Sequence, residues 1–383
     1  MITLNIKTIY KYLLGSAFLL LLAGCEGEWL ERDPNDIITE EQVWNDPVLI
    51  DGLLANYYDR LPKHYSLVDG PGEPDYLTDN WREMAMYTDA MWSGGSNDQW
   101  RNDVPTYDFS RWALWDYKLI RDLNLAIENI DEYSTQLQDA EKTAYKAELR
   151  FLRAYVYFEH VKRMGGVPLI TETMEYTGPG DVEELQYTRA TEQEVYDFVY
   201  NELEAIKDQL GNDGSNSRAN KYTALALQSR AMLYAGSIAR YNNEMANPIT
   251  TPGGEVGIPA AAAQDYYEKA LLAAEDVIQN SPYTLYDNNP DPADNFYEAV
   301  NVDNQNSEMI LAEHYLSSAD KRHWFAYDNI ARPIREDNLG SSAITPSLNL
   351  VEAFPYVDGS PGELQTRTAD GSDYIYYDNV MDI

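Results

Sequence analysis

Apolar residues recur at helical spacing over a series of long segments of this chain. These segments cover about residues 111–131, 139–163, 191–206, 221–240 and 262–280, and an earlier one begins near Thr39. Apolar residues three or four positions apart form one face of an α-helix. The pattern therefore predicts a mainly α protein whose helices pack through their apolar faces.

The last two helical segments resemble a tetratricopeptide-like pair. Small residues at Ala231, Ala270 and Ala274 would let the two helices approach closely. Loops such as 164–189 and 241–259 make the spacing of the helices irregular, which argues against a strict repeat array. We therefore expect a tetratricopeptide-like helical repeat scaffold with long inserted loops.

Local signals mark several helix ends. Thr39 with Gln42, and Thr191 with Glu194, have the spacing of a capping box at a helix N-terminus. The Met-Gly-Gly sequence at 164–166 is expected to end the helix before it, because glycine accepts the backbone conformation of a helix C-cap.

Two regions interrupt the helical pattern. Residues 62–110 are rich in glycine, proline and tryptophan, and a loop this long inside a compact domain is usually functional. After about residue 283 the chain is rich in Asn, Asp, Pro and Tyr. The expected organisation is a helical domain at 42–283 with the inserted loop 62–110, followed by an irregular, loop-rich C-terminal part at 284–383.

The N-terminus has the pattern of an exported lipoprotein. Lys7 and Lys11 precede an apolar run that ends in Leu-Ala-Gly-Cys at 22–25, which resembles a bacterial lipobox. The run is too short to cross a membrane comfortably, but it has the length of a signal-peptide core. We therefore predict a signal peptide at 1–24, lipidation of Cys25 and a tether at 25–41. An ordinary signal peptide followed by a chance cysteine is the alternative.

Charge and cysteine content exclude several classes of protein. The chain has 383 residues with a formal net charge of −36, which repels nucleic acid and anionic lipid headgroups. Membrane contact is therefore expected through the lipid and not through a basic surface. Cys25 is the only cysteine, so no disulfide can form within the chain.

Three stretches resemble the SusD/RagB family of Bacteroidetes outer-membrane nutrient-binding lipoproteins (SusD-like proteins). The first runs from Cys25 through Trp29-Leu30 and Pro34 to Val43-Trp44. The second, the most specific, is 147–158 continued by 163–169. The third lies at 346–359, with Pro346-Ser347 and Asp358-Gly359. Together they follow the family order over most of the chain.

The resemblance implies both a fold and a function. It implies a tetratricopeptide-like body with an irregular part, and a glycan-binding protein that faces outward from the outer membrane. It also implies a TonB-dependent SusC-like transporter as partner, which the lipoprotein covers as a lid. Family members generally continue past the Asp-Gly segment, so the chain is expected to be C-terminally truncated.

The resemblance places the glycan contacts in two loop regions, at 81–109 and 321–327. An exposed aromatic ring matches the C–H face of a sugar, and polar side chains match its hydroxyl groups. The candidate contact residues chosen from the two regions are Trp81, Trp92, Asn97, Asp98, Trp100, Arg101, Trp324 and Tyr327. Trp92, Trp100 and Trp324 are the leading candidates, and the alternative is that each fills the core beneath a loop. Trp112 and Trp115 are expected in the core.

Catalytic and metal-binding interpretations have weaker support. The sequence has no recognisable catalytic motif, and Arg150 and Arg153 are expected to bond structurally to neighbouring loops. A stretch from Asp287 to Glu298 has some of the spacing of a calcium loop, but Pro292 stands where glycine is needed. We expect no cofactor and no enzyme activity. A surface glycan-degrading enzyme, a protein-binding repeat scaffold and a binder of peptide or another nutrient remain the alternatives.

Overall fold

The computed structural model describes residues 38–62, 90–92, 115–178, 182–183, 185–211, 215–301, 306–315, 344–346, 348–356 and 358–362, with only the backbone described for 90–92, 344–346 and 348–349. These residues are mainly helical, as the sequence predicted. Within these ranges, none of the helices combines the length and the apolar character needed to cross a membrane.

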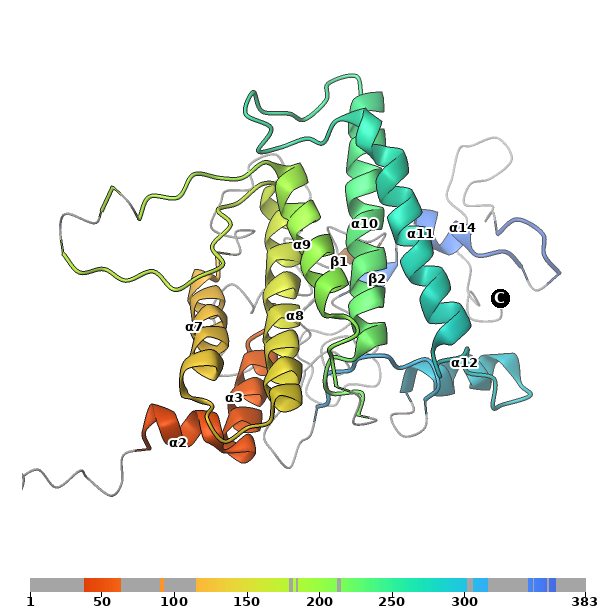
Figure 1. Ribbon diagram of the computed structural model, residues 1–383. Helices are drawn as coiled ribbons and strands as arrows, with labels where there is room; N and C mark the ends of the chain where they lie inside the picture. Colours follow the sequence, from red (N-terminus) through yellow and green to blue (C-terminus); the bar gives the residue numbers. More distant parts are fainter. Residues whose placement is uncertain are drawn as a thin grey trace, which may run out of the picture.

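Five long helices stand side by side in chain order (Figure 1). They are α7 (Tyr117–Tyr133), α8 (Asp139–Met164), α9 (Glu192–Ile206), α10 (Lys221–Glu244) and α11 (Ala263–Asn280), the last preceded by a 3₁₀ turn at Ala260–Ala262. Each helix packs against the one before it, and α10 and α11 share the most extensive contact. This succession of paired neighbours is the tetratricopeptide-like scaffold that the sequence predicted.

Helix α8 forms the centre of the core. Leu152, Tyr157 and Phe158 are completely buried, and the helix contacts α7, α9, α10 and the N-terminal helix α3. A helix that is covered on several sides buries residues all around its axis. The segment 147–158, which carries the sequence resemblance, is therefore the most enclosed stretch of the described chain.

The pair α10 and α11 is closely packed because small residues line the contact. Ala231 and Ala270 are buried there, as predicted, but Ala273 is buried in place of the expected Ala274, which is half-buried. A side chain at Gly236 would place its Cβ 2.9 Å from the ring of Tyr267. The absence of a side chain at this position lets the aromatic ring lie directly on α10.

The N-terminal region contains two helices where the sequence analysis expected one. They are α2 (Glu40–Asn45) and α3 (Pro47–Asp59), and Asp46 between them accepts a hydrogen bond from the Val48 N–H at 2.9 Å. Pro47 has no N–H and is therefore favoured in the first turn of a new helix. The capping box of Thr39 and Gln42 is confirmed at the start of α2.

The C-terminal part holds short elements between its loops. They are α12 (Pro292–Asn301), β2 (Ile344–Pro346) and α14 (Leu348–Ala353). The carboxylate of Asp291 accepts hydrogen bonds from the N–H groups of Ala293 and Asp294, so this acid in the candidate calcium loop caps α12. In the described ranges, no three His, Cys, Asp or Glu side chains are grouped closely enough to hold a metal ion.

Candidate functional site

Most of the predicted site residues lie outside the described residues. These are Cys25, Trp81, Asn97, Asp98, Trp100, Arg101, Trp324 and Tyr327, together with Trp112. Trp92 is described through its backbone, as the last residue of the short strand β1 (Ala90–Trp92). The glycan contacts proposed for these side chains therefore remain predictions.

Strand β1 pairs antiparallel with β2, and this pairing joins two regions that are far apart in the sequence (Figure 1). In the register of the pair, Trp92 lies opposite Ile344 and Ala90 lies opposite Pro346. β1 belongs to the insertion 62–110, which was expected to be loop throughout, and β2 belongs to the C-terminal part. Backbone hydrogen bonds between the strands thus bring the inserted region and the C-terminal part together.

An aromatic cluster lies where the start of α7 contacts α8. The rings of Tyr117 and His160 lie 5.4 Å apart, and the ring of Trp115 lies 6.1 Å from that of Tyr117. Trp115 is half-buried against the core, as expected, but it precedes helix α7. The helix predicted from residue 111 begins at Tyr117, because the carboxylate of Asp116 caps it by accepting the Leu119 N–H at 3.0 Å.

A hydrogen bond to His160 links the residues just before α7 to the central helix α8. The backbone N–H of Asp116 donates to Nε2 of His160 at 3.2 Å. Burial and, to a smaller extent, the nearby Arg163 lower the pKa of the imidazole to about 4, against an opposing effect of Glu159. The ring is therefore neutral at neutral pH, and Nε2 acts as the acceptor while Nδ1 carries the proton. No described residue accepts a hydrogen bond from Nδ1.

Arg150 and Arg153 are structural, as expected, but their main partner lies on a helix. Both pair with Glu202 of α9, at 2.7 Å each. Arg153 also donates to the Asn124 side chain of α7 at 2.7 Å and to the loop carbonyl of Thr171 at 3.0 Å. Burial raises the pKa of the Glu202 carboxyl, but the hydrogen bonds and charges of the two arginines outweigh it and lower the pKa overall.

At the Met-Gly-Gly sequence 164–166, the end of α8 lies close to two other segments, which contain Arg189 with Ala190 and Glu255. We call this place the crossing. Gly165 ends α8 with φ +70°, and the Gly166 N–H donates to the carbonyl of Glu255. A Cβ on Gly166 would lie 1.9 Å from the carbonyl oxygen of Ala190. Arg189 closes the crossing by donating to the carbonyls of Gly166 at 2.7 Å and Met164 at 2.6 Å. The sequence analysis missed Arg189, since no local pattern links it to the end of α8.

Sequence relatives of this chain are SusD-like proteins. It is 28% identical over 236 residues to SusD-like protein P38 of Formosa agariphila, covering 60% of this chain and 43% of the relative. It is 24% identical over 352 residues to a SusD-like protein of Bacteroides ovatus, covering 90% of this chain and 55% of the relative. The chain thus spans about half the length of the relatives that it matches.

The fold is also similar to that of a solved SusD-like structure, over about half of that protein's length. A SusD-like carbohydrate-binding protein of Bacteroides fragilis superposes with a TM-score of 0.57 at 20% identity, over 83% of this chain and 55% of that protein. The SusD-like family model described as "starch-binding associating with outer membrane" matches residues 28–233, just over half of the chain. The helical scaffold, the sequence relatives and this match agree, and the chain belongs to the SusD-like family.

Proposed function

We propose that this chain captures glycans at the cell surface without cleaving them, as a lipoprotein anchored to the outer membrane through Cys25. In this proposal, a TonB-dependent SusC-like transporter receives the captured glycan. The observation that carries the proposal is the family match over residues 28–233, whose description names starch binding and association with the outer membrane. The similar B. fragilis structure, described as a carbohydrate-binding protein, supports the same ligand class.

The fold provides a rigid support for such a surface. The helices from α7 to α11 pack into one continuous core, and β1 and β2 join the inserted region to the C-terminal part. Binding groups on loops benefit from a rigid scaffold, because less conformational freedom is lost when the ligand binds. We propose that Trp92, Trp100 and Trp324 supply the aromatic surface, with Trp81, Asn97, Asp98, Arg101 and Tyr327 around it.

Affinity electrophoresis of the mature protein in gels that contain single polysaccharides tests the proposal. Wild type should be retarded by at least one polysaccharide, and replacing Trp92, Trp100 and Trp324 together by Ala should abolish the retardation. The matched control replaces Tyr176 and Tyr187 by Ala. Both tyrosines are exposed and lie on a loop of the helical body, so this variant should leave retardation unchanged. Unchanged retardation in the tryptophan variant would refute the proposed site.

The alternatives predict different results in the same preparation. A glycan-degrading enzyme would release shorter products from the retained polysaccharide, which chromatography of the reaction detects. A scaffold that binds only proteins or peptides would show no retardation by any polysaccharide.

The anchor and the partner need separate experiments. Cys25→Ser should abolish incorporation of labelled fatty acid and release the protein from outer-membrane fractions. Crosslinking in intact cells should join the wild-type protein to a large outer-membrane transporter, and protease added outside the cells should digest it. Persistence of the Cys25→Ser variant in the membrane would refute the lipid anchor.

A further inference from the structure

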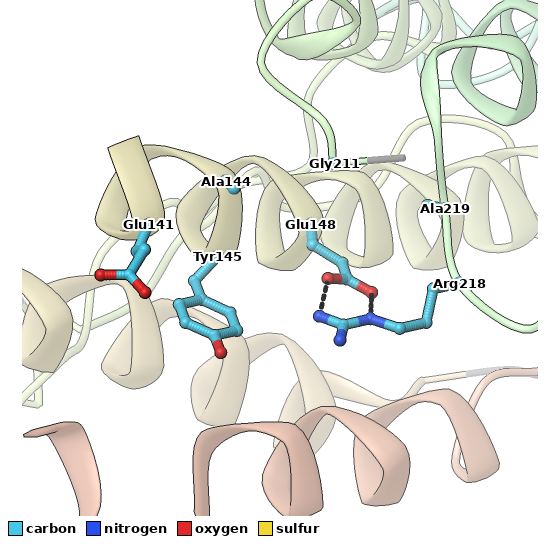
Figure 2. Close-up of a pocket in the computed structure, with 7 residues that line it drawn as sticks. All are labelled: Glu141, Ala144, Tyr145, Glu148, Gly211, Arg218 and Ala219. Atoms are coloured by element: carbon cyan, nitrogen blue, oxygen red, sulfur yellow. Dashed lines mark hydrogen bonds and ion pairs between the residues drawn. The ribbon is translucent and has the colours of Figure 1, made fainter. Parts of the chain in front are cut away.

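A pocket of about 320 Å³ lies on the helical body (Figure 2). Its walls are the first half of α8 and the segment that joins α9 to α10. The lining residues are Glu141, Ala144, Tyr145, Glu148, Gly211, Arg218 and Ala219. Its size is at the lower end of the range for small-molecule sites, which is roughly 300–1,000 Å³.

Arg218 is held firmly at one side of this pocket. Its Nε and Nη2 donate to the Glu148 carboxylate at 2.9 and 2.5 Å, and its Nη1 donates to Asp51 of α3 at 2.9 Å. Tyr58 of α3 donates to the same Glu148 carboxylate at 2.7 Å. A guanidinium has five N–H groups, and these bonds account for three of them. The remaining N–H groups of the one-third-exposed Arg218 side chain are available to an acceptor on a ligand.

An aromatic ring and a further acid share the same side of α8. Figure 2 shows Tyr145 between Glu141 and the Glu148–Arg218 pair, with its ring extending into the space beside α8. The ring is half-buried and Glu141 is exposed. Burial and the nearby Asp51 carboxylate raise the pKa of Tyr145 to about 12. The phenol therefore stays neutral; it donates its proton to Asp51, and its oxygen can accept a hydrogen bond from a ligand.

This combination of groups suits a neutral, polyhydroxylated ring. The Tyr145 ring offers an apolar face, Arg218 offers donors and Glu141 offers acceptors, which together match the C–H face and the hydroxyl groups of a sugar. An anion would be repelled by the carboxylates of Glu141 and Glu148 in the lining and by Asp51 beside Arg218, against the single guanidinium. A cation could approach Glu141, but it would meet the fixed charge of Arg218 at the opposite wall.

We propose that the pocket is a second carbohydrate-binding site, for one or two sugar residues, whose binding groups differ from the tryptophans of the proposed loop site. The choice of carbohydrate as ligand rests on the proposed function. A long polysaccharide that reaches both sites binds with the combined strength of two weak contacts, because the second contact forms within the same complex. The pocket would thus add avidity for polymers over short oligosaccharides.

A probe at the ring itself tests the proposal. 3-Fluorotyrosine placed at position 145 reports contacts in ¹⁹F NMR, with maltose, cellobiose, laminaribiose, xylobiose and arginine amide as separate titrants. At least one disaccharide should shift the signal saturably, both in wild type and in the variant that lacks Trp92, Trp100 and Trp324. No shift with any disaccharide, or a shift with arginine amide alone, would overturn the proposal.

Substitutions extend the test to polymers. Tyr145→Ala should weaken gel retention by a long polysaccharide about tenfold, while Tyr145→Phe, which keeps the ring, should weaken it less. Tyr187→Ala removes an exposed tyrosine elsewhere and should change nothing. Equal retention of Tyr145→Ala and wild type would overturn the proposal.

The two proposals can fail independently. A silent fluorine signal in a protein that still binds polysaccharide through its tryptophans would reject only the second site. A shifted signal in a protein whose retention does not depend on the tryptophans would reject only the loop site.

Discussion

Replacing His160 by Gln should remove a loss of stability that wild type suffers on mild acidification. The imidazole is completely buried, and its Nε2 accepts the backbone N–H of Asp116. Burial lowers its pKa from 6.5 to about 4. Gln can accept the same N–H through its side-chain carbonyl, but it cannot take up a proton.

The size and sign of the effect follow from this pKa shift. In the unfolded chain the imidazole binds a proton near pH 6.5, whereas in the folded chain it stays neutral until about pH 4. Stability is therefore fully present above pH 6.5 and falls as the pH drops from 6.5 through 4. A pKa unit corresponds to about 1.4 kcal/mol, so the full loss is about 3 kcal/mol.

Urea unfolding at a series of pH values from 8 to 4 measures the effect. The difference in unfolding free energy between wild type and His160→Gln should be constant above pH 7 and then move by about 3 kcal/mol in favour of the variant as the pH reaches 4. His160→Phe serves as the matched control. Its stability should depend on pH in the same way as that of His160→Gln. At every pH it should be about 1–3 kcal/mol less stable than His160→Gln, because Phe leaves the Asp116 N–H without an acceptor.

Parallel curves for the three proteins across this range would refute the reasoning. That result would mean that the folded protein accommodates a charged imidazole at no cost, in conflict with its enclosure among the Trp115, Tyr117 and Tyr157 rings.

Three further substitutions test the core by urea unfolding. Glu202→Gln should destabilise by about 3 kcal/mol, because it removes a charged partner from the buried Arg153; a loss below about 1 kcal/mol, typical of an exposed pair, would contradict this. Gly166→Ala should lower the free energy of unfolding by more than about 3 kcal/mol, since its Cβ would lie 1.9 Å from the Ala190 carbonyl oxygen. A folded variant of wild-type stability would contradict this close approach of Gly166 and Ala190. Phe158→Ala should cost about 3–5 kcal/mol, because this ring is completely buried, and a cost near 1 kcal/mol would show that the site is loosely packed.

Local sequence signals predicted the helix starts that depend on a few neighbouring residues. The capping boxes at Thr39 and Thr191 are both present. The break between α2 and α3 was missed, although Asp46 and Pro47 are a common helix start. The start of α7 was set too early because Trp112 and Trp115 continue the apolar spacing, whereas the cap at Asp116 decides where the helix begins.

For the candidate site, the sequence pointed to the loop regions through their tryptophans, and that assignment stays a prediction because those side chains lie outside the described residues. It did not indicate that β1 would pair with β2, because two three-residue strands carry no clear alternating pattern. It also gave no sign of the pocket at Tyr145, whose wall Arg218 comes from a different part of the chain.

The helical class and the order and approximate extent of the long helices could be predicted from the sequence alone, and three stretches of sequence carried the family resemblance. Helical class and helix order follow from apolar spacing and capping residues, which act between residues a few positions apart. The packing of the helices was needed to show that Arg153 and Glu202 pair inside the core, that Arg189 bonds to the end of α8, and that Arg218 and Tyr145 line the same pocket. These contacts join residues brought together by packing of whole helices, and that packing depends on the combined shape of many side chains.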